Sequence, residues 1–268
     1  PVSTNKGYDL PGYINENTLV ICSSFSGNTE ETLEAFEKAK AKNAEIACVS
    51  SGGKLIELAK AQNLNYIQLA PGDSPRAMMG YSITQLLYIL NHYSLISDGF
   101  KNELNKTASL IDELQEEIQA DAEKITNHLF GKIPIIYACD GYKGMAVRFT
   151  QQLAENSKML SWHNIIPEMN HNELVGWRTK NENLAVIFFR NETDHKRNQK
   201  RIEINSEVVS KYTSSVMEYW SKGDSMIEKT FYLINVCDHV SFNLSKRNNV
   251  IVEEIEVINY LKGELAKF

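Results

Sequence analysis

The sequence lacks the marks of a disulfide-rich, membrane-spanning or nucleic-acid-binding protein. Its 268 residues include only four cysteines, which lie far apart and form no Cys-x-x-Cys pair. No apolar run approaches the roughly 18 residues that a membrane-spanning helix requires. The net charge of −6 provides no basic field for a nucleic-acid backbone. These absences predict buried, reduced thiols and a cytoplasmic location, with neither nucleic acid nor membrane as a partner.

Signals for nucleotide and metal binding are also missing. The pair Gly141 and Gly144 is too short for a dinucleotide fingerprint, and Gly-x-Gly-x-x-Gly does not occur. The glycine at position 27 is not followed by the lysine of a nucleotide-binding P-loop. The six histidines show no metal-ligand spacing. The sequence therefore predicts chemistry that needs neither a nucleotide cofactor nor a metal.

What is present is the composition of an ordinary globular protein, with 43% hydrophobic and 23% charged residues. In the first hundred residues, short apolar segments alternate with segments of helical periodicity. This alternation predicts a parallel sheet with right-handed crossovers. The predicted strands are residues 18–24, 45–50 and 66–70, and the predicted helices are residues 29–42, 54–61 and 76–96.

The second half repeats this organisation after a long helical stretch. Apolar positions in residues 101–129 form one stripe against a charged face, which predicts a long amphipathic helix. A second α/β unit starts at Pro134, with a glycine-bearing turn and a helix that ends near Lys158. Its further strands are predicted at 184–190 and 214–220, and its further helices at 226–244 and 253–267. We therefore predict an α/β fold with two parallel-sheet αβα sandwich subdomains, residues 1–97 and 133–268, joined by a linking helix over residues 98–132.

The strongest local signal is the segment SSFSGNTEET, which lies between a predicted strand and a predicted helix. Such a turn presents free backbone N–H groups and the positive end of the helix dipole. The hydroxyls of Ser24, Ser26 and Thr29 surround it, as the binding of a phosphate monoester would require. The alternative is an ordinary helix cap, with Asn28 as the N-cap and Glu31 three residues later.

Other candidate residues are ordinary when each is taken alone. The turn Ser50–Gly53 resembles a second anion cradle, but without further support it is interpreted as a plain tight turn. Arg76 follows a predicted strand end, which is where open α/β sheets bind ligands. Glu155 closes a predicted helix, and His171 lies in a polar loop. Lys262 is on the last predicted helix, where a lysine is by default solvated.

Taken together, five segments give the chain a resemblance to a known family. In order they are TLVICSSFSGNTEET, GDSPRAMMGY, RFTQQLAENSK, IIPEMNHNELVGW and NYLK. They resemble the phosphoglucose/phosphomannose isomerase family of the sugar-isomerase (SIS) superfamily, over essentially the whole chain. The resemblance implies that both predicted subdomains are of the SIS type and that the substrate is a sugar phosphate.

The resemblance also implies a role for each candidate residue. Ser24, Ser26 and Thr29 would hold the substrate phosphate. Arg76 would stabilise the negative charge of a cis-enediolate, as a fixed cation in a dry site should. Glu155 would be the base that moves a proton between C1 and C2 of the sugar.

Two further residues complete the implied mechanism. His171 and Lys262 resemble the pair that opens the sugar ring. In the family the equivalent histidine reaches in from the partner subunit, so the resemblance implies a homodimer in which His171 acts across the interface. Aldose–ketose interconversion needs a base, a cation and an acid for ring opening, and it needs no metal or redox cofactor.

One departure from the family and two alternative functions follow from the same comparison. The family begins with a helix, a strand and a glycine- and serine-rich loop that this sequence lacks. We therefore expect either that about 30 or more further residues precede Pro1, without which the active site is incomplete, or that this protein has lost part of the site. The alternatives to a glucose 6-phosphate isomerase are a non-catalytic phosphosugar-binding regulator and an isomerase for a different phosphosugar. The sequence does not distinguish glucose-only specificity from dual glucose and mannose specificity.

Overall fold

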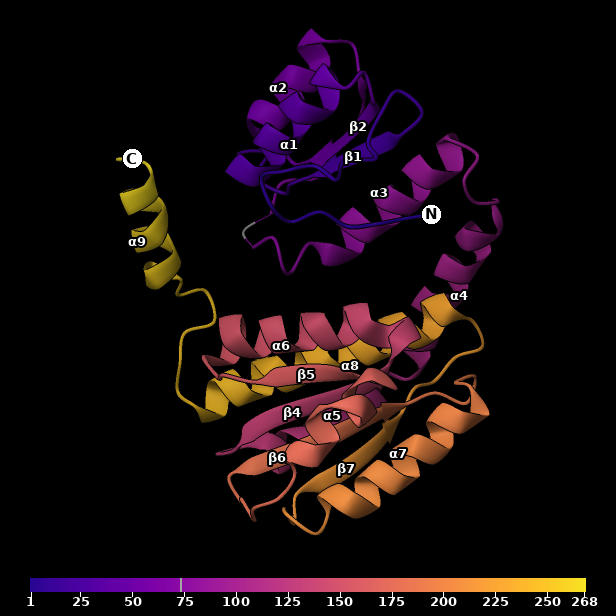
Figure 1. Ribbon diagram of the computed structural model, residues 1–268, viewed down its shortest axis with the longest axis vertical. Helices are drawn as coiled ribbons and strands as arrows, with labels where there is room; N and C mark the ends of the chain where they lie inside the picture. The colour runs from indigo at the N-terminus through magenta and orange to yellow at the C-terminus, as the bar shows by residue number, and fades with distance from the viewer. Residues whose placement is uncertain (73) are drawn as a thin grey trace. The chain divides into compact units, whose positions relative to one another are not determined.

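In the computed structural model, the described residues are 1–72 and 74–268. Asp73, which belongs to the GDSPRAMMGY segment, lies outside the described residues. The chain divides into two units, Pro1–Phe100 and Lys101–Phe268, each built from a sheet and the helices that cover it (Figure 1). None of the helices in the described ranges combines the length and apolar character needed to cross a bilayer.

The first unit is a parallel αβα sandwich. Its three strands lie in the order β1-β2-β3, and every pair is parallel. Successive side chains of β2 point to opposite faces of the sheet. Cys48 packs with Phe36 and Leu55, whereas Val49 packs with Ile89. Helices α1 and α2 therefore cover one face and α3 the other, as Figure 1 shows. The elements are β1 (Leu19–Ser23), α1 (Glu30–Ala41), β2 (Glu45–Ser50), α2 (Gly53–Ala61), β3 (Asn65–Gln68) and α3 (Met79–His92).

The second unit contains a four-stranded sheet with the order β5-β4-β6-β7, again parallel throughout. Its strands are β4 (Ile133–Cys139), β5 (Trp162–Ile166), β6 (Leu184–Arg190) and β7 (Val216–Trp220). Its helices include α5 (Gln115–Leu129), α6 (Lys143–Ser157), α7 (Lys196–Val209), α8 (Met226–Arg247) and α9 (Glu256–Leu265). Three short 3-10 helices complete it: η1 (Asp140–Tyr142), η2 (Glu168–His171) and η3 (Glu173–Gly176).

Both faces of this second sheet are covered. On one face, Phe149 of α6 meets Phe189 of β6 edge to face at 6.0 Å, and α5 and α6 both pack against α8. On the other face, Ile202 of α7 joins a buried cluster with Tyr137 of β4 and Phe188 of β6. The predicted α/β fold with two parallel sheets is therefore confirmed.

The structure departs from the predicted elements at several places, of which three concern whole helices or strands. The helix predicted over residues 101–129 is divided at Leu114 into α4 (Gly99–Glu113) and α5. Strand β5 and helix α7 were not predicted at all. Backbone hydrogen bonds from Leu114 N to Leu110 O (3.0 Å) and from Ile118 N to Leu114 O (2.8 Å) continue across the division. The departure in α4 and α5 is therefore a local irregularity, whereas β5 and α7 are additional elements.

Candidate active site

Ser24, Ser26 and Thr29 lie in one turn between β1 and α1, which we name the phosphate turn (residues 24–29). The Ser24 side chain is buried and shares a hydrogen bond of 2.8 Å with the Thr29 hydroxyl. The backbone N–H of Gly27 donates to the Ser24 carbonyl oxygen at 3.1 Å, which closes the turn. Ser26 and Thr29 remain exposed, so the turn presents their hydroxyls to solvent.

The helix-cap interpretation of Asn28 is wrong, because Asn28 caps a different helix. Its side-chain oxygen accepts a hydrogen bond of 3.0 Å from the backbone N–H of Lys54, in the first turn of α2. The N-cap of α1 is Thr29, and within the described ranges no side chain makes the capping hydrogen bond there. The first-turn N–H groups of α1 are therefore left for water or for a bound anion.

The turn Ser50–Gly53 fastens the phosphate turn, and the interpretation as a plain tight turn misses this role. The carbonyl oxygen of Phe25 accepts hydrogen bonds from the Ser51 N–H (2.9 Å), the Ser51 hydroxyl (2.6 Å) and the Ser50 hydroxyl (3.1 Å). Because β1 and β2 are parallel neighbours, both turns lie at the carboxyl edge of the sheet. The second turn therefore acts as a brace for the first.

Two glycines make the close contact between these turns possible. Gly27 has a φ of +71°, and a Cβ placed on it would lie 1.9 Å from the carbonyl oxygen of Gly52. Gly53 has a φ of +68°, and its Cβ would lie 2.3 Å from the carbonyl oxygen of Ser26. L-residues with side chains rarely adopt this left-handed conformation, so both positions require glycine for conformation and for space.

Acidic residues surround the start of α1. Glu30 and Glu31 occupy its first turn, where they interact favourably with the helix dipole. The Tyr8 hydroxyl donates a hydrogen bond to Glu30, and this contact raises the pKa of Tyr8 to about 12. Lys38 forms ion pairs with Asp9 at 2.7 Å and with Glu34 at 2.6 Å. These contacts attach the N-terminal segment to α1. Because Glu30 and Glu31 add negative charge beside the turn, a phosphate bound there would be stabilised by a nearby cation.

Arg76 lies in the segment between β3 and α3. It was predicted to start a helix, but α3 begins only at Met79. Arg76 instead sits in a turn held by hydrogen bonds from Ala77 N to Ser74 O (3.0 Å) and from Met78 N to Pro75 O (3.2 Å). Its side chain is partly buried. The first unit thus holds the three predicted phosphate ligands in one turn and the predicted cation in the segment between β3 and α3.

Glu155 lies in the last turn of α6 and is partly buried. Polar contacts to α8 fix this end of the helix on both sides of Glu155. The Gln152 amide donates to Asp238 at 2.9 Å, and the Asn156 amide donates to the Ser241 hydroxyl at 2.9 Å. Glu155 therefore lies at a helix end that hydrogen bonds hold on both sides of it.

His171 ends η2 and is exposed. Among the residues that the structure describes, no hydrogen bond or ion pair involves its imidazole ring. The loop around it is nonetheless anchored, since Met169 is fully buried and the Glu173 carboxylate is bonded to the strands beneath. No spacing along the chain singled out Glu173, because its partners come from β4 and β5.

Lys262 lies on α9 and is exposed, like the rest of that helix. In the described part of the chain it has no side-chain partner. Apolar side chains on the same helix are also exposed, including Val257 (79%) and Leu261 (57%). Helix α9 therefore presents both its lysine and its apolar residues outward.

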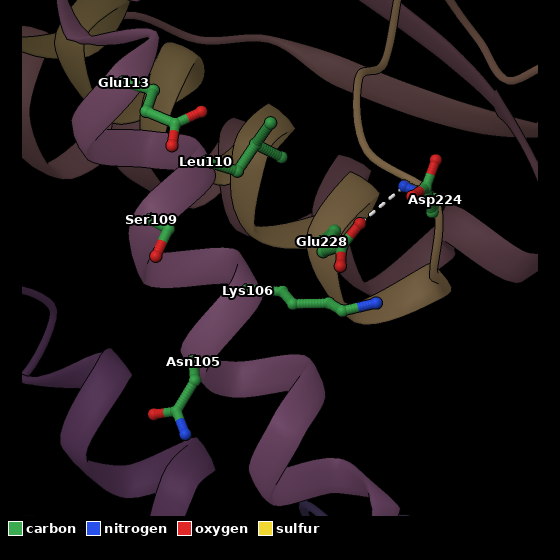
Figure 2. Close-up of a pocket in the computed structure, with 7 residues that line it drawn as sticks. All are labelled: Asn105, Lys106, Ser109, Leu110, Glu113, Asp224 and Glu228. Atoms are coloured by element: carbon green, nitrogen blue, oxygen red, sulfur yellow. Dashed lines mark hydrogen bonds between the residues drawn. The ribbon is translucent and has the colours of Figure 1, made fainter.

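A separate hollow of about 370 Å³ lies between α4 and the start of α8 (Figure 2). Figure 2 shows Lys106 extending its ammonium group toward the loop that carries Asp224. The Glu228 carboxylate accepts a hydrogen bond of 2.5 Å from the Asp224 N–H and belongs to the capping box of α8. None of the predicted site residues lines this hollow.

Comparison with known proteins places this chain in a family. The family model described as "Bacterial phospho-glucose isomerase C-terminal SIS domain" matches residues 118–265. A Caldicellulosiruptor bescii protein named bifunctional phosphoglucose/phosphomannose isomerase is 35% identical over 278 residues, which cover 100% of this chain and 82% of that protein. A protein of the same name from Aquifex aeolicus is 30% identical over 270 residues, with 100% and 82% covered.

Among solved structures, glucosamine-6-phosphate deaminase from Thermotoga maritima is similar in fold, with a TM-score of 0.68 at 13% identity. That alignment covers 91% of this chain and 74% of the other. Identity this low shows the fold alone, whereas the two relatives match in sequence along the whole chain. The chain therefore belongs to the bifunctional phosphoglucose/phosphomannose isomerase family.

Proposed function

We propose that this protein interconverts glucose 6-phosphate and fructose 6-phosphate, and that it also converts mannose 6-phosphate. The observation that carries the proposal is the phosphate turn. It combines first-turn N–H groups that no described side chain caps with the hydroxyls of Ser24, Ser26 and Thr29. A phosphate monoester needs these donors. The relatives named phosphoglucose/phosphomannose isomerase support the choice of hexose 6-phosphates as substrates.

The proposed proton transfer uses Glu155 and Arg76. The Glu155 carboxylate takes the proton from C2 of the open-chain aldose, which leaves a cis-enediolate. The same carboxyl group then returns a proton to C1 while the proton on O2 moves to O1, and the ketose results. The enediolate carries negative charge on its oxygens, and the Arg76 guanidinium offsets that charge while the intermediate exists. The rigid end of α6 supports this assignment, because a base must keep one geometry for both transfers.

Ring opening precedes this transfer, and we assign it to His171 and Lys262. An acid must protonate the ring oxygen while a base removes the proton of the anomeric hydroxyl. The exposed imidazole of His171 lies on an anchored loop, which supports this assignment. We further propose that the protein is a homodimer in which His171 serves the partner's site. The side chains of His171 and Lys262 are both exposed, which supports their action on a substrate that residues of other elements bind.

We also propose that the protein works in the cytoplasm without a metal or nucleotide. Cys22, Cys48, Cys139 and Cys237 are all buried and free. Burial raises the pKa of the Cys139 thiol to about 12, which keeps it protonated and unreactive. Four reduced thiols support a reducing compartment.

Replacement of Glu155 by Gln tests the proposed reaction. Turnover of fructose 6-phosphate should fall by roughly 10²–10⁴-fold, while binding of the phosphosugar is retained. In deuterated water, the wild-type protein should introduce deuterium at C2 of the recovered glucose and mannose 6-phosphates, and Glu155→Gln should not. Glu116→Gln, which changes an exposed glutamate of α5, is the control and should behave as wild type.

The products identify the function among the alternatives. Glucose 6-phosphate alone would show single specificity, and both aldoses would show the dual activity. Binding of fructose 6-phosphate without any exchange or product would identify a phosphosugar-binding regulator instead. Full activity in Glu155→Gln would remove this residue from the mechanism.

A further inference from the structure

The carboxylate of Glu173 forms an unusually complete set of contacts for a loop residue. One oxygen accepts hydrogen bonds from the Tyr137 hydroxyl at 2.5 Å and from the Trp162 indole N–H at 3.1 Å. The other oxygen accepts a hydrogen bond of 2.6 Å from the Asn164 amide. The three donors come from β4 and β5, so Glu173 ties its loop to two neighbouring strands.

A separate chemical constraint makes each of these groups a hydrogen-bond donor to Glu173. Burial and the adjacent Glu173 charge raise the pKa of Tyr137, which therefore stays a hydroxyl donor. The oxygen of the Asn164 side chain already accepts from the Ile165 N–H at 2.7 Å, so its NH₂ group must face the carboxylate. An indole N–H can only donate. The pocket formed by these groups is therefore matched to a carboxylate and not to an amide.

The same contacts define where His171 can lie. Before it, Met169 is fully buried in the cluster under the sheet. After it, Trp177 is buried and its indole N–H donates to the Tyr137 hydroxyl at 3.2 Å. His171 is thus the exposed crest of a short loop that Met169 holds on one side and Glu173 holds on the other. No bond of its own fixes the imidazole within the described residues, so its position depends on these anchors.

We propose that Glu173 is a positioning residue for ring opening. Its carboxylate fixes the loop, and the loop holds the His171 imidazole in the position and orientation that ring opening requires. Glu173 does not touch the substrate in this scheme, and it moves no proton. The inference rests on the proposed function of His171. A displacement of about 1 Å in a reacting group can cost roughly 10²-fold in rate, so loss of these bonds should be visible in kinetics.

The test exchanges the donor and acceptor roles between positions 173 and 164. In Glu173→Gln, the NH₂ group of the new amide faces another donor in either orientation. In one orientation it faces the Asn164 NH₂ group, and in the other it faces the Tyr137 hydroxyl and the Trp162 N–H. In Asn164→Asp, two carboxylates face each other. In the double variant Asn164→Asp/Glu173→Gln, the carboxylate at 164 accepts from the amide at 173, and the Ile165 N–H keeps its acceptor. The same net charge is retained as in the wild type.

Ring opening is measured apart from isomerisation, as catalysed exchange between the two anomers of glucose 6-phosphate by NMR exchange spectroscopy. Each single variant should lose about 10²-fold in this exchange, and the double variant should recover most of it. Binding of arabinonate 5-phosphate, an open-chain sugar-acid phosphate that needs no ring opening, should be unchanged in all three. Unchanged exchange in Glu173→Gln, or no recovery in the double variant, would overturn the proposal.

Two reference variants separate failure of this inference from failure of the proposed function. His171→Gln should abolish anomer exchange, and Glu155→Gln should abolish isomerisation while anomer exchange continues. If His171→Gln exchanges anomers like the wild type, the role proposed for His171 is wrong. If His171→Gln is inactive while Glu173→Gln is normal, the role of His171 stands and the positioning role of Glu173 is wrong.

Discussion

At the scale of the residue, the shape of a side chain should matter as much as its charge at position 76. A guanidinium can donate to two oxygens of an enediolate through a rigid planar fork, whereas an ammonium group acts as a point charge. We expect Arg76→Lys to lower kcat by roughly 10²-fold with a smaller change in KM, because the contact forms with the intermediate. Steady-state kinetics with fructose 6-phosphate measure both parameters.

The control for this change is Arg197→Lys, since Arg197 is an exposed residue of α7. It should leave kcat and KM unaltered. Wild-type turnover in Arg76→Lys would show that a diffuse positive charge is sufficient, and the assignment of Arg76 to the enediolate would be wrong.

At the scale of the element, one amide links the start of α2 to the phosphate turn. Removal of a capping side chain typically costs about 1 kcal/mol of stability. Asn28→Ala should therefore lower the free energy of unfolding by about that amount and speed amide hydrogen exchange at Lys54, in the first turn of α2. Asn28→Asp keeps an acceptor and should be close to wild type. Faster exchange at the start of α1 instead would contradict the assignment of this cap.

The elements that the sequence predicted are those whose pattern is local. Strands β1, β2 and β6 are apolar runs, and the structure places them within one residue of their predicted ends. Helix α7 was missed because only three of its residues are buried, while the rest of the helix is largely charged or polar and solvated. Those buried residues are Ile202, Asn205 and Val209. Strand β5 was missed because five residues that include a histidine and an asparagine give no clear alternation.

Prediction of the site followed the same division. Ser24, Ser26 and Thr29 lie within six residues of one turn, so their convergence could be read from the sequence. The partner of Asn28 could not, because Lys54 lies on another helix, 26 residues away. The contacts of Glu173 could not be predicted for the same reason, since its three donors belong to β4 and β5. Contacts between elements require the fold, and no spacing along the chain encodes them.

At the scale of the whole molecule, the proposal that His171 acts in the partner's site predicts complementation between two inactive variants. Glu155→Gln and His171→Gln homodimers should each be inactive. A heterodimer of the two would carry one site with both wild-type groups, so a random mixture should recover about a quarter of wild-type activity. Co-refolding of the two variants, followed by sizing chromatography and assay, measures this recovery. If His171 serves its own chain, the mixture stays as inactive as its parents.

The interlocked turns of the first unit also limit how the proposed phosphate site can change during evolution or be moved into another protein. Gly27 lies against Gly52 and Gly53 lies against Ser26, so each turn occupies the space that a side chain on the other would need. A side chain added to one turn therefore clashes with the backbone of the other turn. Tolerated substitutions in the two turns should for this reason occur in pairs. A designer who grafts the hydroxyl-bearing turn onto a new sheet must carry the serine–glycine turn of the neighbouring strand with it. Without that second piece, the carbonyl of Phe25 loses three hydrogen-bond donors at once.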